Sequence, residues 1–286
     1  MEKIKTFDPG LGFKRESESR LSKEDTREEP MNEMFNLKGK VAVVTGGNGG
    51  IGKGIGRGFA AAGGDLVIAA RNPAKTAEAV REIQEEFGVR VLGVQVDVRE
   101  EGQIRGMVQR VLDLFDRIDI LVNNAGTNIR KNPQDYDLSE WDEVLNTNLR
   151  SAFLCSKAVY PVMKLAKSGK IINIGSMTSI FGNPQASLYG ASKGGIVQLT
   201  RSLAVAWAPD HIQVNAILPG WINTDLTRNA RKAWPNLNER VLARTPTGRW
   251  GEPADLAGAA IFLASHASDF VTGVALPVDG GFSVMM

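Results

Sequence analysis

From residue 38 onward, short apolar runs rich in β-branched residues alternate with longer segments of helical periodicity. The runs are apolar at nearly every position, which is typical of strands buried on both faces. Alternation of such strands with helices predicts an α/β fold, a doubly wound parallel sheet with helices on both faces. About seven runs qualify as strands, namely KVAVVTG, DLVIAA, RVLGVQVDV, IDILVNN, KIINIGS, IQVNAILPG and GVALPVDGG.

The helical segments connect these strands. They are expected at about 50–62, 73–88, 103–115 and 254–263, with another helix around Tyr189. The segment 138–167 also has helical periodicity, and we expect it to be broken near Ser151 or Pro161. Right-handed crossovers then bring the carboxyl ends of all strands to one edge of the sheet, where ligands bind.

Length and composition predict one large domain. The chain has 286 residues, of which 43% are hydrophobic and 23% charged, enough for a well-buried core. Residues 1–36 differ, because KRESESRLSKEDTREEP carries mixed charges and almost no large apolar side chains. We therefore expect a flexible extension at 1–36, with a partner-contacting arm as the alternative, and a single catalytic domain at 37–286.

Several classes of function are disfavoured by composition. The net charge of +2 and the lack of a basic run argue against nucleic acid as a partner. No apolar stretch approaches the roughly 20 residues that a membrane span needs, and the N-terminus lacks a signal peptide's apolar core. The one cysteine, Cys155, suits a cytoplasmic protein, and the distant His211 and His266 make a metal site or a histidine triad improbable.

A glycine-rich turn, TGGNGGIGKGIG at 45–56, follows the first strand and opens the first helix. Two patterns fit: G-x-G-x-x-G at Gly47, Gly49 and Gly52, and T-G-x-x-x-G-x-G at Thr45, Gly46, Gly50 and Gly52. Glycine lets the backbone approach a pyrophosphate, which lies at the positive end of the helix. The turn predicts a Rossmann-type dinucleotide site; the alternative, close helix packing, suits the helix glycines Gly54, Gly56 and Gly58.

The end of the second strand bears on the choice of cofactor. NAD sites usually have an acidic residue there for the ribose hydroxyls, whereas this strand ends IAARNP. Arg71 could meet a 2′-phosphate instead and stack on the adenine. We therefore expect NADP in preference to NAD.

Tyr189 and Lys193 stand four residues apart on a predicted helix and so share one face. A free tyrosine has a pKa near ~10, which is too high for a base at neutral pH. A nearby ammonium favours the phenolate and lowers that pKa toward the working pH. The pair predicts proton transfer by Tyr189, tuned by Lys193.

Five ordered motifs resemble the short-chain dehydrogenase/reductase family from about residue 35 to the C-terminus. They are the T-G-x-x-x-G-x-G turn, N-N-A-G at 123–126, Asn148 in LNTNLRSAF, Ser176 followed by Tyr189-x-x-x-Lys193, and Pro219-Gly220. The resemblance implies a nicotinamide-dependent oxidoreductase that acts on a secondary alcohol or ketone. The charged N-terminal segment has no counterpart in the family pattern.

The resemblance implies roles at matching positions. Tyr189 would be the general acid/base, Ser176 would hydrogen-bond the substrate oxygen, Lys193 would hold the ribose, and Asn148 would hold a water in a proton relay. Cofactor contacts are expected at Gly46, Asn48, Gly50, Ile51, Gly52, Arg71, Asp97, Val98, Asn124, Ala125, Gly126, Tyr189, Lys193, Pro219, Gly220, Ile222 and Thr224.

The substrate is less constrained. Within the family, the C-terminal region resembles gluconate 5-dehydrogenase and 2-deoxygluconate 3-dehydrogenase enzymes, which tend to carry an arginine just beyond N-N-A-G. Arg130 matches, and with Ser176 and Tyr189 it could bind a sugar acid by clamping its carboxylate. Arg228, Arg231 and Lys232 in the predicted lid at 222–250 could assist, or they could be solvated lid residues. Trp221 could line the pocket or only pack the lid. Alternatives are a 3-oxoacyl-carrier-protein reductase and a non-catalytic nucleotide-binding regulator.

The family resemblance also implies a homotetramer. In this family, the helices equivalent to those of Asn148 and Tyr189 form a dimer interface, and the C-terminal segment helps to form the tetramer. Apolar or small residues on more than one face of these helices suggest surplus apolar surface, at Ala152, Phe153, Ala204 and Trp207. The same pattern would fit a monomer with thick helix packing.

Overall fold

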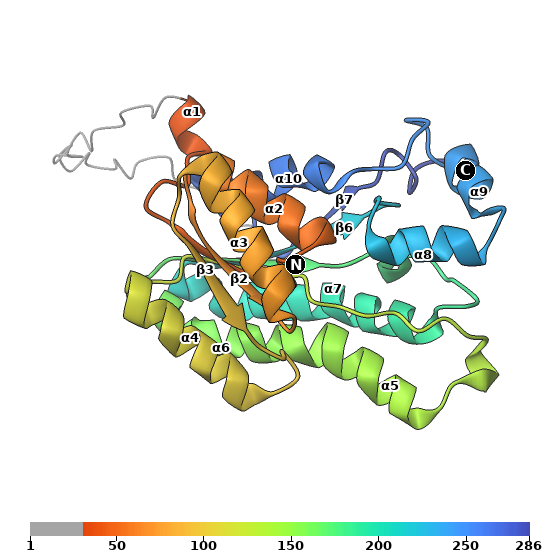
Figure 1. The fold of residues 1–286 in the computed structure, drawn as a ribbon, viewed down its shortest axis with the longest axis horizontal. Coiled ribbons are helices and arrows are strands. Elements are labelled where there is room, and N and C mark those ends of the chain that lie inside the picture. Colours follow the sequence, from red (N-terminus) through yellow and green to blue (C-terminus); the bar gives the residue numbers. More distant parts are fainter. Residues whose placement is uncertain (1–30) are drawn as a thin grey trace, which may run out of the picture. The chain divides into compact units, whose positions relative to one another are not determined.

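The computed structural model describes residues 31–286, which form a seven-stranded sheet between two layers of helices (Figure 1). All neighbouring strands are parallel, in the order β3-β2-β1-β4-β5-β6-β7. The strands are β1 (Val41–Thr45), β2 (Asp65–Ala70), β3 (Val91–Gln95), β4 (Ile120–Asn123), β5 (Gly169–Ile174), β6 (Ile212–Pro219) and β7 (Ala275–Val278). The predicted fold class is confirmed. The direction of winding reverses between β1 and β4, which is where ligands bind in such sheets.

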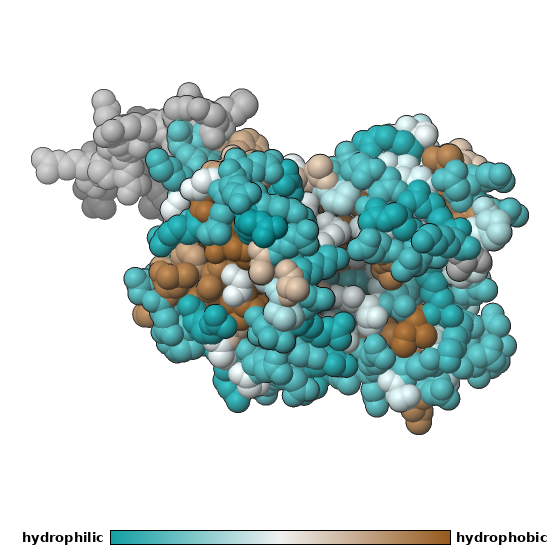
Figure 2. Space-filling view, viewed as in Figure 1, coloured by the Kyte–Doolittle hydropathy of each residue, from teal (hydrophilic) through white to brown (hydrophobic). Residues whose placement is uncertain are grey.

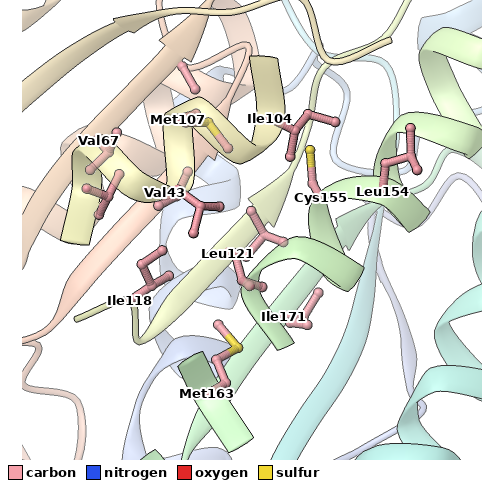
Figure 3. Close-up of a cluster of buried hydrophobic side chains, with 14 of the residues drawn as sticks. Val43, Val67, Ile104, Met107, Ile118, Leu121, Leu154, Cys155, Met163 and Ile171 are labelled. Atoms are coloured by element: carbon pink, nitrogen blue, oxygen red, sulfur yellow. The ribbon is translucent and has the colours of Figure 1, made fainter. Parts of the chain in front are cut away.

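Two apolar cores explain why the strands are apolar at every position. One face of the sheet is covered by α2 (Gly50–Ala61), α3 (Pro73–Phe87) and α10 (Ala257–Ala264), and the other by α4 (Glu101–Phe115), α6 (Ser151–Ala166) and α7 (Ser187–Trp207) (Figure 1). Successive strand residues point to opposite faces, so Val43 enters the core of α4 and α6 while Val44 enters the core of α2. Figure 3 shows the first of these cores, with Val43, Leu121 and Ile171 of the sheet facing Ile104, Met107, Cys155 and Met163 of the helices.

The break expected near Ser151 or Pro161 does not occur. The helix α5 (Leu138–Leu145) continues through a π-helical turn, η2 (Asn146–Arg150), directly into α6. Ser151 has helical dihedrals (φ −60°, ψ −42°), because the wider turn absorbs the irregularity without ending the helix. Pro161 lies inside α6 between the buried Val159 and Met163, whose packing keeps the helix intact although proline donates no hydrogen bond.

The glycines inside α2 allow close helix packing, which is the role suggested for them as the alternative to cofactor binding. A Cβ added to Gly54 would lie 2.5 Å from the Pro253 carbonyl oxygen, and one added to Gly58 would lie 2.6 Å from the Ala257 Cβ. Pro253 begins η5 (Pro253–Leu256) and Ala257 begins α10. These glycines therefore let α2 lie directly against the C-terminal helices.

Shorter elements complete the described chain. They are α1 (Met31–Met34), η1 (Pro133–Asp135), η3 (Met177–Ser179), η4 (Ala208–Asp210), η6 (His266–Ser268) and, within the predicted lid, α8 (Asp225–Ala233) and α9 (Leu237–Ala243). Most of the predicted N-terminal extension, residues 1–30, lies outside the described residues, so the domain boundary stays a prediction. Among residues 31–286, no helix combines the length and apolarity needed to cross a membrane, and no group of three or more His, Cys, Asp or Glu side chains is placed to hold a metal ion.

The surplus apolar surface expected on the two long helices is only partly there. Ala152 and Ala204 are buried in the core, and Trp207 stacks on Tyr160 with ring centroids 4.7 Å apart. Phe153 is 43% exposed and is the one predicted residue of this set that faces outward. Leu165 of α6 and Val205 of α7 are also exposed, so the two helices do leave apolar surface free, although most of the residues named from the sequence are packed in the core.

Candidate active site

The glycine turn connects β1 to α2 at the point where the sheet reverses its winding. Gly46 and Gly50 have positive φ angles of 64° and 50°, which favour glycine. A Cβ on Gly52 would lie 2.5 Å from the Gly46 carbonyl oxygen and would also collide with the Asn124 amide. The positive φ angles of Gly46 and Gly50 favour the T-G-x-x-x-G-x-G register, although Gly47 of the other register also lacks room for a Cβ. The first N–H groups of α2 have no intrahelical acceptor and so suit an anion.

Hydrogen bonds between Thr45 and the 124–125 segment tie the first half of the sheet to the second. The Thr45 hydroxyl accepts from the backbone N–H groups of Asn124 (3.0 Å) and Ala125 (3.1 Å). The Asn124 side-chain amide donates to the carbonyl oxygens of Thr45 (2.9 Å) and Gly46 (3.2 Å). Thr45 at the end of β1 thus joins the predicted cofactor residues Gly46, Asn124 and Ala125 into one bonded unit.

Asn148 lies in the π-helical turn, a feature that is frequent at functional sites. Its side chain accepts from the Thr127 N–H (2.8 Å) and donates to the Thr127 carbonyl (2.9 Å) and the Ser192 hydroxyl (3.0 Å). Only 2% of the residue is exposed. Asn148 thereby connects the loop after Gly126 to the helix that carries Tyr189 and Lys193.

Tyr189 and Lys193 lie one turn apart on α7, as their spacing predicts. The Lys193 ammonium is 5.6 Å from the Tyr189 ring centroid and donates to the Ile174 carbonyl at 2.6 Å. Burial lowers the pKa of Lys193 to about 8. Ser176 follows β5 and caps η3, accepting from the Thr178 N–H at 3.1 Å.

Burial has the largest effect on the pKa of the Tyr189 phenol. Burial raises its pKa above the ordinary value, whereas a hydrogen bond with Ser176 and the positive charge of Arg130 act to lower it. Arg130 is thus the cation that favours the phenolate in this structure. The expectation that Lys193 lowers the pKa of Tyr189 stays a prediction.

A cavity of about 970 Å³ extends from the glycine turn to the lid and brings most of the predicted site together. Its predicted members are Gly46, Asn48, Gly50, Ile51, Asn124, Ala125, Gly126, Arg130, Ser176, Tyr189, Lys193, Pro219, Gly220, Trp221, Ile222 and Thr224. Asn148 and Gly52 lie behind this lining, in contact with Thr127 and Asn124 respectively.

Three residues predicted at the adenine end do not line this cavity. Arg71 is exposed directly after β2, and Val98 is buried beyond β3. Asp97 forms a two-pronged ion pair with Arg99, with one N–O distance of 2.6 Å, and this pair lowers the pKa of the Asp97 carboxyl. Their contacts to an adenine remain predictions.

Arg130 lines the cavity, and no carboxylate among the described residues pairs with it. Its guanidinium lies 4.6 Å from the Trp234 ring centroid, and its Nη1 is buried with no hydrogen-bond partner among the described residues. Burial lowers the pKa of Arg130. A buried donor with no partner has a large desolvation cost, which an anionic ligand would offset.

Two further residues that line the same cavity, Asn128 and Thr178, were missed by sequence reasoning. The Asn128 Oδ1 and the Thr178 Oγ1 are buried and have no partner among the described residues. Asn128 stands two residues before Arg130, and Thr178 two residues after Ser176. The only signal in the sequence for Asn128 and Thr178 was that they stand near predicted residues. Nearness in sequence does not predict the direction of a side chain.

The basic lid residues differ from those expected. Arg228 pairs with Asp225 at 2.6 Å, while Arg231 bonds Asn223 at 2.7 Å and stacks 4.3 Å from the Trp250 ring centroid. Neither they nor Lys232 line the cavity, whose basic lid residues are Arg240 and Arg244. Trp221 does both things considered for it, since it lines the cavity and packs edge-on against Trp250.

Comparison with known proteins identifies the family of the chain. A family model described as Enoyl-(Acyl carrier protein) reductase matches residues 46–283. The 2-dehydro-3-deoxy-D-gluconate 5-dehydrogenase of Escherichia coli (strain K12) is 42% identical over 250 residues, covering 87% of this chain and 97% of that protein. The 5-keto-D-gluconate 5-reductase of the same strain is 38% identical over 259 residues, covering 89% and 99%.

A solved structure is equally similar. The crystal structure of a gluconate 5-dehydrogenase from Burkholderia cenocepacia J2315, in complex with NADP and tartrate, has a TM-score of 0.85 and 38% identity, covering 89% of this chain and 99% of that one. The chain belongs to the short-chain dehydrogenase/reductase family. It is an NAD(P)-dependent oxidoreductase that transfers hydride between the nicotinamide cofactor and a secondary alcohol or ketone.

Proposed function

We propose that this enzyme interconverts a hydroxyl and a keto group on a sugar acid, with NADP(H) as the preferred cofactor. The observation that carries the proposal is Arg130, which lines the cavity and whose buried Nη1 has no hydrogen-bond partner among the described residues. A guanidinium binds a carboxylate with two parallel hydrogen bonds, which would satisfy this donor. Relatives named for gluconate derivatives support the same substrate class.

Tyr189 is the proposed general acid/base. In reduction it would donate its phenolic proton to the oxygen that becomes the alcohol, and in oxidation the phenolate would remove that proton. The nicotinamide ring, when bound, supplies or accepts the hydride. Ser176 would hydrogen-bond the same substrate oxygen and hold it near the phenol.

Lys193 and Asn148 are proposed to position this proton transfer. The Lys193 ammonium, held by the Ile174 carbonyl, would bond the cofactor ribose and favour the phenolate. Asn148 would hold the water of a proton relay. Its side chain and the Lys193 ammonium both lie next to Gly126, since a Cβ there would be 3.2 Å from the Asn148 Oδ1 and 3.8 Å from the Lys193 Nζ. Asn128 and Thr178 would bond substrate hydroxyls, which a sugar acid has and a simple ketone lacks.

The parts of the cofactor are assigned to residues that follow different strands of the sheet. The N–H groups of the glycine turn, from Gly46 to Gly52, would bind the pyrophosphate, and Ile222 and Thr224 the carboxamide. Arg71, Asp97 and Val98 would form the adenosine end. The absence of an acidic residue at the end of β2 supports NADP over NAD, and NADP is bound in the gluconate 5-dehydrogenase structure.

A substrate screen tests this proposal, with formation or loss of reduced cofactor as the readout. Aldonates would be compared with the matching uncharged polyols, each with NADP⁺ and NAD⁺, and acetoacetyl thioesters with NADPH. Turnover of an aldonate well above its polyol is expected. Equal rates would remove the role of Arg130, and activity on the thioester alone would favour a 3-oxoacyl-carrier-protein reductase.

We also propose a cytoplasmic homotetramer. An apolar groove of about 500 Å³ between η2, α6 and α7, lined by Leu149, Phe153 and Leu199 among others, supports one interface of this assembly. The single cysteine, Cys155, leaves no internal disulfide, which suits a reducing compartment. Light scattering of the protein and of Phe153→Asp would test the assembly, and an unchanged mass for the variant would argue against this interface.

A further inference from the structure

Lys75 is a basic residue that lines the active-site cavity but is not among the residues predicted for the site. It belongs to the first turn of α3, where its backbone N–H bonds the Asn72 side chain at 3.0 Å. Its side chain reaches back over the glycine turn, because a Cβ added to Gly49 would lie 2.9 Å from the Lys75 Nζ. The ammonium therefore lines the same cavity as the N–H groups of the turn.

The partner of Lys75 comes from the lid. Asp225, the first residue of α8, lies with its Oδ2 3.3 Å from the Lys75 Nζ. The preceding residue, Thr224, also faces the turn, since a Cβ on Gly50 would be 3.3 Å from its methyl group. The lid thus begins directly above the glycine turn, and one ion pair joins it to α3. Figure 2 shows mainly hydrophilic residues over α3 and α8 on this face.

This ion pair is weak enough to exchange. The side chains of Lys75 and Asp225 are 47% and 68% exposed, and exposed pairs of this kind contribute little to stability. Asp225 has a second cationic partner, because its pKa is lowered first by Arg228 and then by Lys75. A phosphate has more charge and more acceptor oxygens than a carboxylate, so it would compete well for the ammonium.

We propose that Lys75 is a ligand of a phosphate group of the bound dinucleotide, and that Asp225 of the lid competes with that phosphate for the same ammonium. The N-terminus of α2 attracts a phosphate, and the Lys75 ammonium lies above the glycine turn at that same end of the helix. The inference rests on the use of NAD(P) and is independent of the substrate proposed above. It also links the start of the lid to the charge of the cofactor.

Cofactor binding without substrate tests the inference. Dissociation constants for NADPH and NADH would be measured from cofactor fluorescence for the intact protein, Lys75→Gln, Asp225→Asn and the double variant. Lys75→Gln is expected to weaken binding about 10-fold, the loss of one charge-assisted hydrogen bond. Asp225→Asn should tighten binding about 2-fold to 5-fold where Lys75 is present and have no effect where it is not.

Arg81→Gln is the matched control, because it removes one positive charge from the exposed side of the same helix, farther from the turn. A greater loss for NADPH than for NADH would identify the 2′-phosphate as the partner of Lys75, and an equal loss would identify the pyrophosphate. The same binding for Lys75→Gln and Arg81→Gln would overturn the inference. So would an effect of Asp225→Asn that persists in the double variant. Thermal melting of each variant would separate these results from misfolding.

Discussion

The two ends of the active-site cavity are built differently. At the glycine turn, the polar side chains are bonded to the protein itself, as Thr45 and Asn124 show. At the substrate end, Asn128, Arg130 and Thr178 each keep a buried polar atom without a partner among the described residues. The first end offers a ligand mainly backbone groups, and the second offers side chains.

This difference matches what each end must recognise. A dinucleotide has a constant shape, so a rigid surface with close-fitting glycines can bind it with few adjustable side chains, of which Lys75 is the one proposed above. A substrate is distinguished from its relatives by a few polar groups, and unpaired donors and acceptors reject molecules that leave them unsatisfied. Substitutions should therefore act on cofactor affinity at one end and on substrate choice at the other.

Tyr189→Phe should have the largest effect. Loss of the phenolic proton is expected to lower kcat by about 10²-fold to 10⁴-fold in both directions, while the dissociation constant for the cofactor changes little. Steady-state kinetics and a binding titration would measure the two quantities. If kcat stayed within a few-fold of the intact enzyme, another group would have to transfer the proton.

Gly52→Ala should damage only the cofactor end. The new Cβ would lie 2.5 Å from the Gly46 carbonyl oxygen, so the turn must shift, with a cost of about 1–3 kcal/mol in the free energy of unfolding. Affinity for NADPH should fall about 10²-fold or more, as judged by titration. Gly102→Ala on α4 is the control, because nothing lies within 4 Å of a Cβ there; a similar loss in that variant would contradict the explanation.

Arg130→Lys should damage only the substrate end. The lysine keeps the charge but not the planar two-pronged contact, so KM for a sugar acid should rise about 10-fold to 100-fold. The dissociation constant for NADPH and the KM for an uncharged polyol should be unchanged. An equal rise for acid and polyol would mean that Arg130 supports the cavity without contacting a carboxylate.

Arg130→Gln should have a further, smaller effect, a change in the pH dependence of kcat/KM. The charge of Arg130 lowers the pKa of Tyr189 against the effect of burial; its removal should raise that pKa, because the phenolate loses a favourable neighbour. The limb of kcat/KM for oxidation that rises with pH should move to higher pH by up to about one unit. Arg130→Lys should leave this limb in place, and a shift of the same size in both variants would show that charge is not the cause.

Much of the fold could be predicted from local pattern. The strand DLVIAA coincides with β2, and the alternation of apolar runs with helices predicts the parallel sheet that the structure has. The interruption expected near Ser151 was wrong, because local propensity does not distinguish a broken helix from one with a π-helical turn. Packing on the core decided that question, and it also decided that Ala152 and Ala204 are buried.

The candidate site was predictable where chemistry and spacing coincide. Tyr189 and Lys193 share a helix, so a spacing of four residues places them on one face without any tertiary contact. Lys75 and Asp225 are 150 residues apart, and their ion pair depends on how the lid crosses the glycine turn. The directions of Arg228 and Arg231, away from the cavity and into the lid, likewise depend on packing.

The sequence alone therefore determined the strands, most of the helices, the edge of the sheet where a ligand would bind, and the spacing that places Tyr189 and Lys193 on one helix face. Those features follow from periodicity and from backbone geometry within a few residues. Only the tertiary structure decided which polar atoms at that edge are paired and which are left for a ligand. The physical reason is that a hydrogen bond or an ion pair depends on distances of a few ångströms between segments far apart in the chain, and no local pattern specifies those distances.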